Sequence, residues 1–395
     1  MPRPAWILYA GTFINRFGSF VAVFLILYLT KNGYSATQAG LAVGAYGVGG
    51  LPASGIGGYL ADRVGRKTTI AISMFGSAVA MIALSQARGY GIILATVALA
   101  GLMSELYRPA SSALLADLVP EEQRVVAFAA YRLAINAGFA FGPALAGFLA
   151  NSSFFYLFVG DAVTSAAFGT IALLLLPHGV RRSDQVEAPE GSVATVLRDR
   201  SFMVFCLATL IISFVYFQGE TTLALHVRAE GLSPATYGTL LSFNGLIIVF
   251  LELGFSGITQ RKKARPVMAL GALLTGAGFT LTAAAHSFPA LAATVFVWTL
   301  GEIVHAPVAQ AYVANLAPAH MRGRYLGIWG FSFALAFILA PTVGAWLFGL
   351  SPSALWFTCG GLSVVAAALI LKGPERVVTP VLGPEPGPEI AGVET

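Results

Sequence analysis

The sequence predicts an all-α membrane protein whose twelve transmembrane helices form two pseudo-symmetric halves of six helices each. Hydrophobic residues make up 57% of the 395 residues and charged residues only 10%, whereas a soluble domain carries about 25% charged residues. Apolar runs of the roughly 20 residues that cross a bilayer follow one another along most of the chain. The chain is also internally doubled, because a segment near residue 110 recurs 198 residues later.

Turn and breaker residues separate the apolar runs, for example Lys31-Asn32-Gly33 and Ser351-Pro352. The first run is too long for a cleaved signal peptide and is expected to remain as a span. The twelve expected spans cover residues 5–30, 36–60, 67–87, 90–116, 123–150, 153–176, 201–227, 234–259, 265–286, 288–316, 322–349 and 351–372.

The distribution of positive charge predicts the orientation of these spans. With the N-terminus inside, seventeen of the 23 Lys and Arg residues fall in the tails and the even-numbered loops. Three fall in odd-numbered loops (Lys31, Arg88 and Arg228) and three within spans (Arg16, Arg108 and Arg132). Cytoplasmic loops carry such an excess, so both termini are expected in the cytoplasm. The basic residues form no aromatic-interleaved patch, which argues against a nucleic-acid partner.

The internal similarity divides the chain into two halves. Pro109–Arg124, PASSALLADLVPEEQR, matches Pro307–Arg322, PVAQAYVANLAPAHMR, and Pro143 matches Pro341 at the same offset. A parallel repeat of this kind indicates two six-helix units. We expect an N-terminal half over residues 1–176, a cytoplasmic linker over 177–200, a C-terminal half over 201–372 and a disordered cytoplasmic tail over 373–395.

Three segments carry a family resemblance that covers about residues 5–372. Gly57–Ile70, GGYLADRVGRKTTI, resembles the G-x-L-a-D-r-x-G-r-[KR] signature between the second and third helices of the major facilitator superfamily. Asn136–Gly147, NAGFAFGPALAG, resembles the G-x-x-x-G-P-x-x-G-G motif of its proton-coupled antiporters, with Ala146 in place of one glycine. Tyr107–Arg124 resembles the end of the fourth helix in bacterial drug:proton antiporters.

The resemblance implies a multi-pass transporter of the bacterial inner membrane that works as a monomer by alternating access. In that family, contacts of the charged loop hold the cytoplasmic side shut, although a merely solvated basic turn is the alternative. Asp62 is expected to face the helix that begins near Arg322, and Arg66 to pair with Asp117. Arg132 is expected to pair near Asp117 or Glu121. The predicted conformational latch is Gly58, Asp62, Arg63, Gly65, Arg66, Lys67, Asp117 and Arg132, and the antiporter-type motif of the fifth helix is Gly138, Gly142, Pro143 and Gly147.

Ionisable side chains inside the spans are the candidates for proton coupling. Each costs at least about 2.5–3.5 kcal/mol near the middle of the bilayer, so each is a functional hypothesis. A carboxylic acid in apolar surroundings can take up a proton near neutral pH; the alternative is a hydrogen-bonded carboxylate or a buried ion pair that only fixes helix packing. Asp161 and Glu252 are expected to play local roles. The predicted coupling residues are Glu302, Glu105, Glu220 and His305.

Polar and aromatic residues on the expected cavity helices are candidates for substrate contacts. Arg16, Glu105 and Arg108 form a charge cluster that would either hold an anionic group and tune a proton site, or fix helix packing. The predicted substrate-cavity residues are Asn15, Arg16, Tyr107, Arg108, Asn136, Tyr216, Gln218, Asn244 and Trp298.

The most favoured function is proton-coupled efflux of amphiphilic or drug-like molecules, with small-molecule substrate, protons and the lipid bilayer as partners. Uptake or facilitated diffusion of a small metabolite or peptide is an alternative. Peptide transporters of the superfamily carry E-x-x-E-R on the first helix, and here Thr12-Phe-Ile-Asn15-Arg16 keeps only the Arg. A non-transporting membrane sensor is a further alternative. No nucleophile elbow, Walker sequence or metal-ligand spacing occurs, so we expect no catalytic residue, cofactor or metal.

Overall fold

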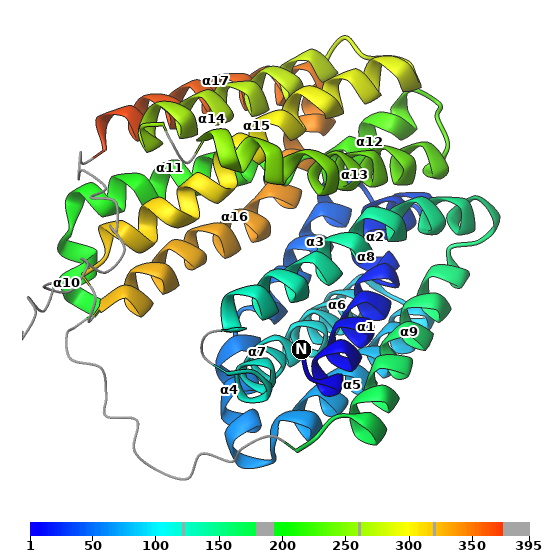
Figure 1. Cartoon of the computed structure of the whole chain (residues 1–395). Coiled ribbons are helices and arrows are strands. Elements are labelled where there is room, and N and C mark those ends of the chain that lie inside the picture. The colour runs from blue at the N-terminus through cyan, green and yellow to red at the C-terminus, as the bar shows by residue number, and fades with distance from the viewer. Residues whose placement is uncertain (121–122, 179–192, 260–261, 319–320, 374–395) are drawn as a thin grey trace, which may run out of the picture.

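The computed structural model describes residues 1–120, 123–178, 193–259, 262–318 and 321–373, and these are helical with short connections (Figure 1). The predicted all-α fold class is confirmed. The helices are α1 (Arg3–Phe17), α2 (Phe20–Lys31), α3 (Ala36–Gly50), α4 (Ala53–Arg63), α5 (Arg66–Gln86), α6 (Tyr90–Glu105), α7 (Tyr107–Leu118), α8 (Arg124–Ser152), α9 (Phe155–Leu175), α10 (Val193–Arg198), α11 (Arg200–Tyr216), α12 (Thr222–Ala229), α13 (Pro234–Thr259), α14 (Ala264–Thr282), α15 (Phe288–Leu316), α16 (Arg322–Leu350) and α17 (Pro352–Lys372).

Eleven segments of the described chain are long and apolar enough to cross a membrane, and Arg200–Tyr216 is a shorter apolar helix in the place of the seventh span. Together they follow the twelve expected spans within a few residues at most boundaries. The expected linker has α10 at its end, while residues 179–192 and the expected tail from residue 374 lie outside the described residues.

Four spans are each built from two consecutive helices, a feature that the sequence did not predict. The breaks lie at 18–19 between α1 and α2, at 51–52 between α3 and α4, at residue 106 between α6 and α7, and at 217–221 between α11 and α12. In lipid, backbone groups freed by a break must find partners within the protein. The breaks are therefore the places where polar side chains are needed inside the spans.

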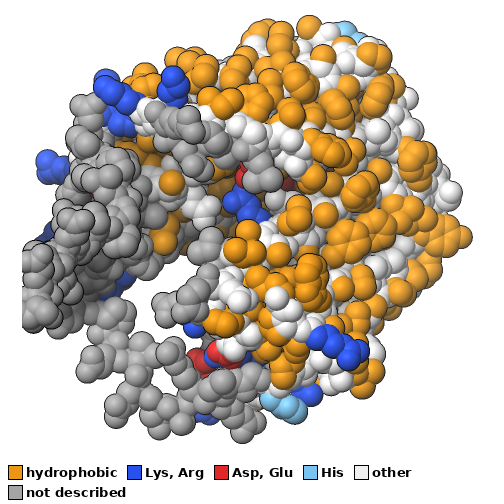
Figure 2. Space-filling model, in the orientation of Figure 1, with side chains coloured by type: hydrophobic (Ala, Val, Ile, Leu, Met, Phe, Trp, Pro, Cys, Tyr) orange, Lys and Arg blue, Asp and Glu red, His pale blue; other side chains and the backbone are white. Residues whose placement is uncertain are grey.

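The two halves of the molecule meet at one end and separate at the other. In Figure 1, α2 and α8 lie beside α12 and α13 at the closed end, whereas α4 and α7 lie well apart from α10 and the start of α16. The space-filling view shows a hollow on this side, in which charged side chains lie among apolar ones (Figure 2).

Small residues make the contact between the halves possible. A Cβ atom on Gly147 of α8 would lie 2.8 Å from Cα of Ala235 on α13, and one on Gly44 of α3 would lie 2.9 Å from the carbonyl oxygen of Ile338 on α16. Gly238 of α13 approaches the backbone of Pro143 even more closely. Close backbone approach through small residues is the usual basis of helix packing in membranes. The closed end is thus a tight contact of backbone against backbone.

Candidate functional site

Polar side chains gather at the breaks of spans one, four and seven. Arg16 lies just before the break between α1 and α2, Glu105 and Tyr107 flank the break at Leu106, and Glu220 lies in the break between α11 and α12. The structure brings the candidate residues together in two clusters, one in each half.

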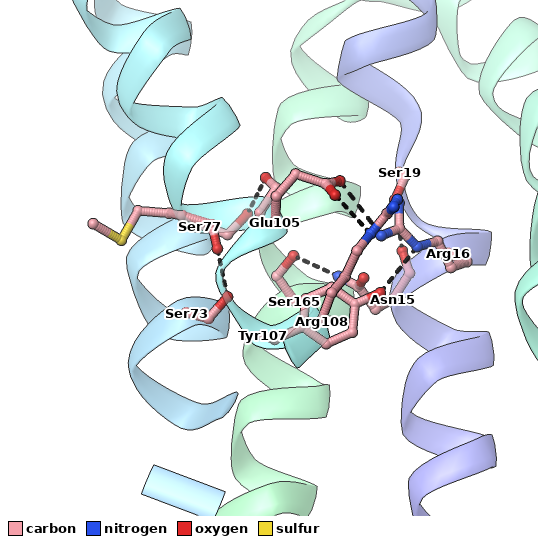
Figure 3. A network of polar contacts seen from close by, with 11 residues as sticks. Asn15, Arg16, Ser19, Ser73, Ser77, Glu105, Tyr107, Arg108 and Ser165 are labelled. Atoms are coloured by element: carbon pink, nitrogen blue, oxygen red, sulfur yellow. Dashed lines mark hydrogen bonds and ion pairs between the residues drawn. The ribbon is translucent and has the colours of Figure 1, made fainter. Parts of the chain in front are cut away.

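The cluster of the N-terminal half is an ion-paired one (Figure 3). Glu105 contacts two guanidinium groups, with 2.6 Å between its Oε2 and Nε of Arg108 and 3.5 Å between its Oε1 and Nη2 of Arg16. Nε of Arg16 also donates to the hydroxyl of Tyr107 at 3.0 Å. Glu105 is 22% exposed and Arg108 is 55% exposed. The cluster carries one negative and two positive groups, and its most exposed member is a cation.

Residues of α9 support this cluster from behind. Nδ2 of Asn15 donates to Oγ of Ser165 at 3.3 Å. The backbone N–H of Val21, in the first turn of α2, donates to Oδ2 of Asp161 at 3.3 Å. Asp161 is buried, and its carboxylate satisfies a backbone group at the break of span one. Its position agrees with the local role expected from the sequence, although the break itself was not expected.

The cluster of the C-terminal half contains two acids with neutral partners. Nδ2 of Asn244 donates to Oε2 of Glu302 at 3.1 Å and lies 3.0 Å from Oγ1 of Thr299. Tyr216 lies near the carboxylates of both Glu302 and Glu220, and the described residues include no hydrogen bond from its hydroxyl to either acid. Both acids are half-buried. Acids from spans seven and ten therefore lie near one another, with Tyr216 beside them.

An aromatic wall adjoins this second cluster. Trp298 stacks on Phe279, with ring centroids 5.4 Å apart and planes 11° apart, and meets the edge of Tyr216 at 6.3 Å. Phe279 also stacks on Trp356. The indole N–H of Trp298 is buried and has no hydrogen-bond partner among the described residues. A buried stack of aromatic rings with one unused donor thus lies next to the two acids.

Three sequence candidates lie outside the two clusters. Nδ1 of His305 lies 2.9 Å from the carbonyl oxygen of Met268, so the ring packs against α14 rather than beside Glu302. Gln218 is fully buried, and its Nε2 donates to the carbonyl oxygens of Phe214 and Ala340. Asn136 is half-buried on α8.

The expected latch residues are partly engaged. Arg66, 7% exposed, forms an ion pair with Asp117 and donates from Nη1 to the carbonyl oxygen of Ala113 at 2.9 Å. Nζ of Lys67 donates to the carbonyl oxygen of Leu173 at 3.3 Å. The expected pairing of Arg66 with Asp117 is therefore present, and it joins α5 to α7 within one half.

The remaining latch residues lie on the open side. The guanidinium of Arg63 lies 5.0 Å from the ring centre of Tyr59. Gly65 has φ +92° and ends the turn before α5. Asp62 is exposed, and the described residues include no ion-pair partner for it. The two halves do not approach closely at this loop, since a Cβ on Gly58 would meet open space. That approach is made at the opposite end by glycines of α3.

The expected partners of Arg132 are wrong. Its Nη2 lies 2.6 Å from Oε1 of Glu252, so it pairs across the two halves, from α8 to α13. Asp117 is taken by Arg66, and residue 121 lies outside the described residues. Glu252 is accordingly an inter-half contact rather than a local one.

The motif of the fifth helix packs on both of its neighbours. Cβ atoms on Gly138 and Gly142 would meet the backbone of Phe17 in α1, and one on Gly147 would meet α13. The matching small residues of α13, Gly238 and Gly245, were missed because glycine alone is a weak signal. The motif residues thus hold the break of span one against the other half.

Among the described residues, no group of three or more His, Cys, Asp or Glu side chains could hold a metal ion. The polar groups in both clusters are carboxylates, guanidiniums, hydroxyls and an amide. Such groups can hold charge, donate hydrogen bonds and exchange protons.

The family model described as Major Facilitator Superfamily matches residues 8–263 and 221–391. An uncharacterized MFS-type transporter of Bacillus subtilis, YqjV, is 27% identical over 349 residues, covering 86% of this chain and 85% of the relative. The quinolone resistance protein NorA of Staphylococcus aureus is 23% identical, covering 94% and 96%. A Na(+), Li(+), K(+)/H(+) antiporter of Planococcus maritimus is also 23% identical, covering 91% and 92%.

Solved structures show the same fold at low identity. The nucleoside transporter NupG matches with a TM-score of 0.82 and 13% identity, covering 94% of this chain and 99% of that one. A POT family transporter in complex with a thioalcohol-conjugated peptide matches with a TM-score of 0.80 and 16% identity, covering 94% and 96%. These relatives and structures are transporters rather than enzymes.

Proposed function

This chain belongs to the major facilitator superfamily of transporters, and from that premise we propose that it exports amphiphilic or drug-like small organic molecules in exchange for protons. It would do so as a monomer in the bacterial inner membrane, with both termini in the cytoplasm. Alternating access between the two halves is the expected mechanism.

The observation that supports this proposal is that Glu302 and Glu220, from spans ten and seven, are half-buried and lie near one another and near Tyr216. The partners found for these two acids among the described residues are neutral. An ionised carboxylate without a cationic partner is costly inside the membrane, so loss of its proton must be compensated by another charge or by water. A positively charged or strongly polar substrate supplies that compensation. Proton and substrate would then occupy the site in turn.

Glu105 is a weaker candidate for the coupling acid. Two guanidinium groups already compensate its charge, so a cationic substrate is not needed to balance the ionised carboxylate at this position. We assign the cluster of Arg16, Glu105 and Arg108 to keeping one wall of the cavity positive. The C-terminal half then provides the opposite wall, where the charge of Glu302 and Glu220 changes with proton binding.

The aromatic wall supports an amphiphilic substrate. The stacked rings of Trp298 and Phe279 are buried behind the acids, and the half-buried Tyr216 in front of them is the ring that would attract an organic cation. The names of two relatives point the same way, since one is a quinolone resistance protein and another a cation/proton antiporter. For this chain, efflux of drug-like molecules remains our proposal.

The arrangement of the halves indicates how the exchange would be gated. If the N-terminus is cytoplasmic, the end at which the halves separate faces the cytoplasm and the small-residue contacts close the outer side. Asp62 and its neighbours on the open side would then engage the other half only when the protein turns outward. His305, packed on α14, would influence helix packing rather than carry the proton.

The test uses inverted vesicles with an imposed pH gradient and a fluorescent cationic dye. We expect gradient-driven dye movement in the wild type, and its loss in Glu302→Gln or Glu220→Gln. Glu230→Gln is the matched control, because Glu230 pairs with His286 outside the clusters. Glu105→Gln should retain partial coupling. Dye movement that ignores the gradient, or full activity in both acid variants, would refute the proposed antiport.

Uptake of a small polar metabolite is the second candidate function. Solved structures with this fold include peptide and nucleoside transporters, and the positive group of Arg108 is exposed in the cavity wall. If right-side-out vesicles accumulate a peptide or nucleoside along a proton gradient while dye stays unmoved, uptake replaces efflux.

A further inference from the structure

A second cavity lies at the closed end of the molecule, away from both polar clusters. It has a volume of about 400 Å³ and lies between the halves. Leu27 of α2 and Ala150 of α8 form its wall in the N-terminal half, and Val227 of α12 and Leu232 form its wall in the C-terminal half. The cavity therefore exists in this shape only while the two halves meet at this end.

Two cations line this apolar cavity. Lys31 and Arg228 are the charged residues of the lining. The sequence places only three Lys or Arg residues in the odd-numbered loops, namely these two and Arg88. Positive charge is depleted on that side of membrane proteins. Lys and Arg side chains generally lie at membrane surfaces. That tendency alone does not explain why two of the three cations on this side line the same cavity.

Neither cation is paired with an acid in the part of the chain that the structure describes. Nη1 of Arg228 donates to Oγ1 of Thr30 across the two halves at 2.6 Å, which leaves its other N–H groups for a ligand. Nζ of Lys31 lies 5.2 Å from the ring centre of Phe154. The nearby Glu230 is paired with His286. Among the described residues no ion pair involves either lining cation.

We propose that this cavity binds an amphiphile with one anionic group, and that the bound molecule holds the outer end of the transporter closed. The anionic group, a phosphate or a carboxylate, would lie between Lys31 and Arg228, and its hydrocarbon chain would lie along the walls formed by Leu27 and Val227. A phospholipid of the bilayer and a free fatty acid share this chemistry. The effect on closure rests on the proposed alternating access, because a ligand shared by both halves favours the state in which they meet.

Binding is tested on the purified full-length protein in detergent by native mass spectrometry. The probes are dioleoylphosphatidylglycerol, dioleoylphosphatidylcholine and oleate. The wild type should retain one anionic molecule, and a Lys31→Gln/Arg228→Gln variant should bind it roughly ten- to thirtyfold more weakly, since each surface cation contributes about a tenfold factor or less. Arg88→Gln removes the third cation of the same side and should bind as the wild type does.

The three probes distinguish a bound phospholipid from a bound fatty acid, and both from binding that does not depend on anionic charge. Retention of phosphatidylglycerol identifies a lipid headgroup, and retention of oleate alone identifies a free fatty acid; either supports the proposal. Equal retention of phosphatidylcholine, or wild-type retention by the double variant, would overturn it. The measurement involves no transport, so loss of dye movement in the acid variants and loss of lipid binding are independent results.

Closure is tested by the distance between spin labels on Gln86 and Ser287, which are exposed at the closed end in opposite halves. Saturating anionic lipid should narrow the distribution toward the short distance in the wild type and leave the double variant unchanged. The native Cys206 and Cys359 are buried, which limits labelling at other positions. Bound lipid without any change in the distribution would refute the effect on closure.

Discussion

Gly147→Ala should open the closed end of the molecule. The added Cβ would lie 2.8 Å from Cα of Ala235 and from the carbonyl oxygen of Pro234. Ordinary van der Waals contact begins at 3.4 Å, so α8 and α13 must separate by about 0.6 Å. Backbone atoms cannot turn aside as a side chain does, and overpacking of this kind costs about 1–3 kcal/mol. That energy acts only on the state in which the two helices meet, which shifts the equilibrium about five- to 150-fold toward the open state.

The assay is the label distance between Gln86 and Ser287 in detergent and in nanodiscs. The long-distance population should rise in Gly147→Ala and rise further in Gly147→Val. Gly254→Ala is the matched control. Gly254 lies on α13, the helix that Gly147 contacts, and a Cβ there would meet nothing within 4 Å. A Gly147→Ala protein that is stable and monodisperse but keeps the wild-type distribution would refute the reasoning.

Three further predictions concern the loop and the inter-half contacts. Gly65→Ala should lower the free energy of unfolding by about 1–3 kcal/mol, because φ is +92° there and a side chain strains that conformation. Gly58→Ala should leave it nearly unchanged, because a Cβ there meets nothing within 4 Å; equal shifts in melting temperature would contradict this. Neutralising Arg132 and Glu252 singly and together should give a coupling free energy of at most about 1 kcal/mol that falls with salt, because the pair is partly exposed; a larger, salt-independent value would mean that the pair is dehydrated. Arg66→Gln should cost about 3–5 kcal/mol by removing the buried cation that forms the ion pair with Asp117 on α7; a melting temperature close to that of the wild type would show that water solvates the site.

The sequence predicted the spans well because length and hydropathy alone decide them. It also singled out Glu220, Glu302, Tyr216 and Asn244, which the structure brings together, because each polar or acidic group within an apolar run needs a partner or a task. Whether these residues carry the proton is a matter for the vesicle assay.

The helix breaks and the pairs between distant helices could not be predicted. Phe17-Gly18-Ser19-Phe20 lies within an apolar run, and its Gly-Ser pair is only a weak local sign of the break that the carboxylate of Asp161 stabilises. The Arg132–Glu252 pair depends on how α8 and α13 are aligned along their length, which small residues on both helices decide. Periodicity gives the face of a helix but not its alignment with a helix more than a hundred residues away.

The two-part construction of span one has a mechanical consequence. Its two segments, α1 and α2, are separate helices joined at Gly18 and Ser19, and Arg16 lies beside that joint. α2 carries Lys31, which lines the cavity at the closed end, while α1 carries Arg16, whose guanidinium contacts Glu105. A tilt of α2 therefore need not move α1. The two helices move together only as far as the hydrogen bond from Val21 to Asp161 keeps the joint rigid. Under the proposed alternating access, span one would act as an adjustable linkage, and the stiffness of its joint would set how closely movement of α2 follows the charge state of the Arg16 cluster.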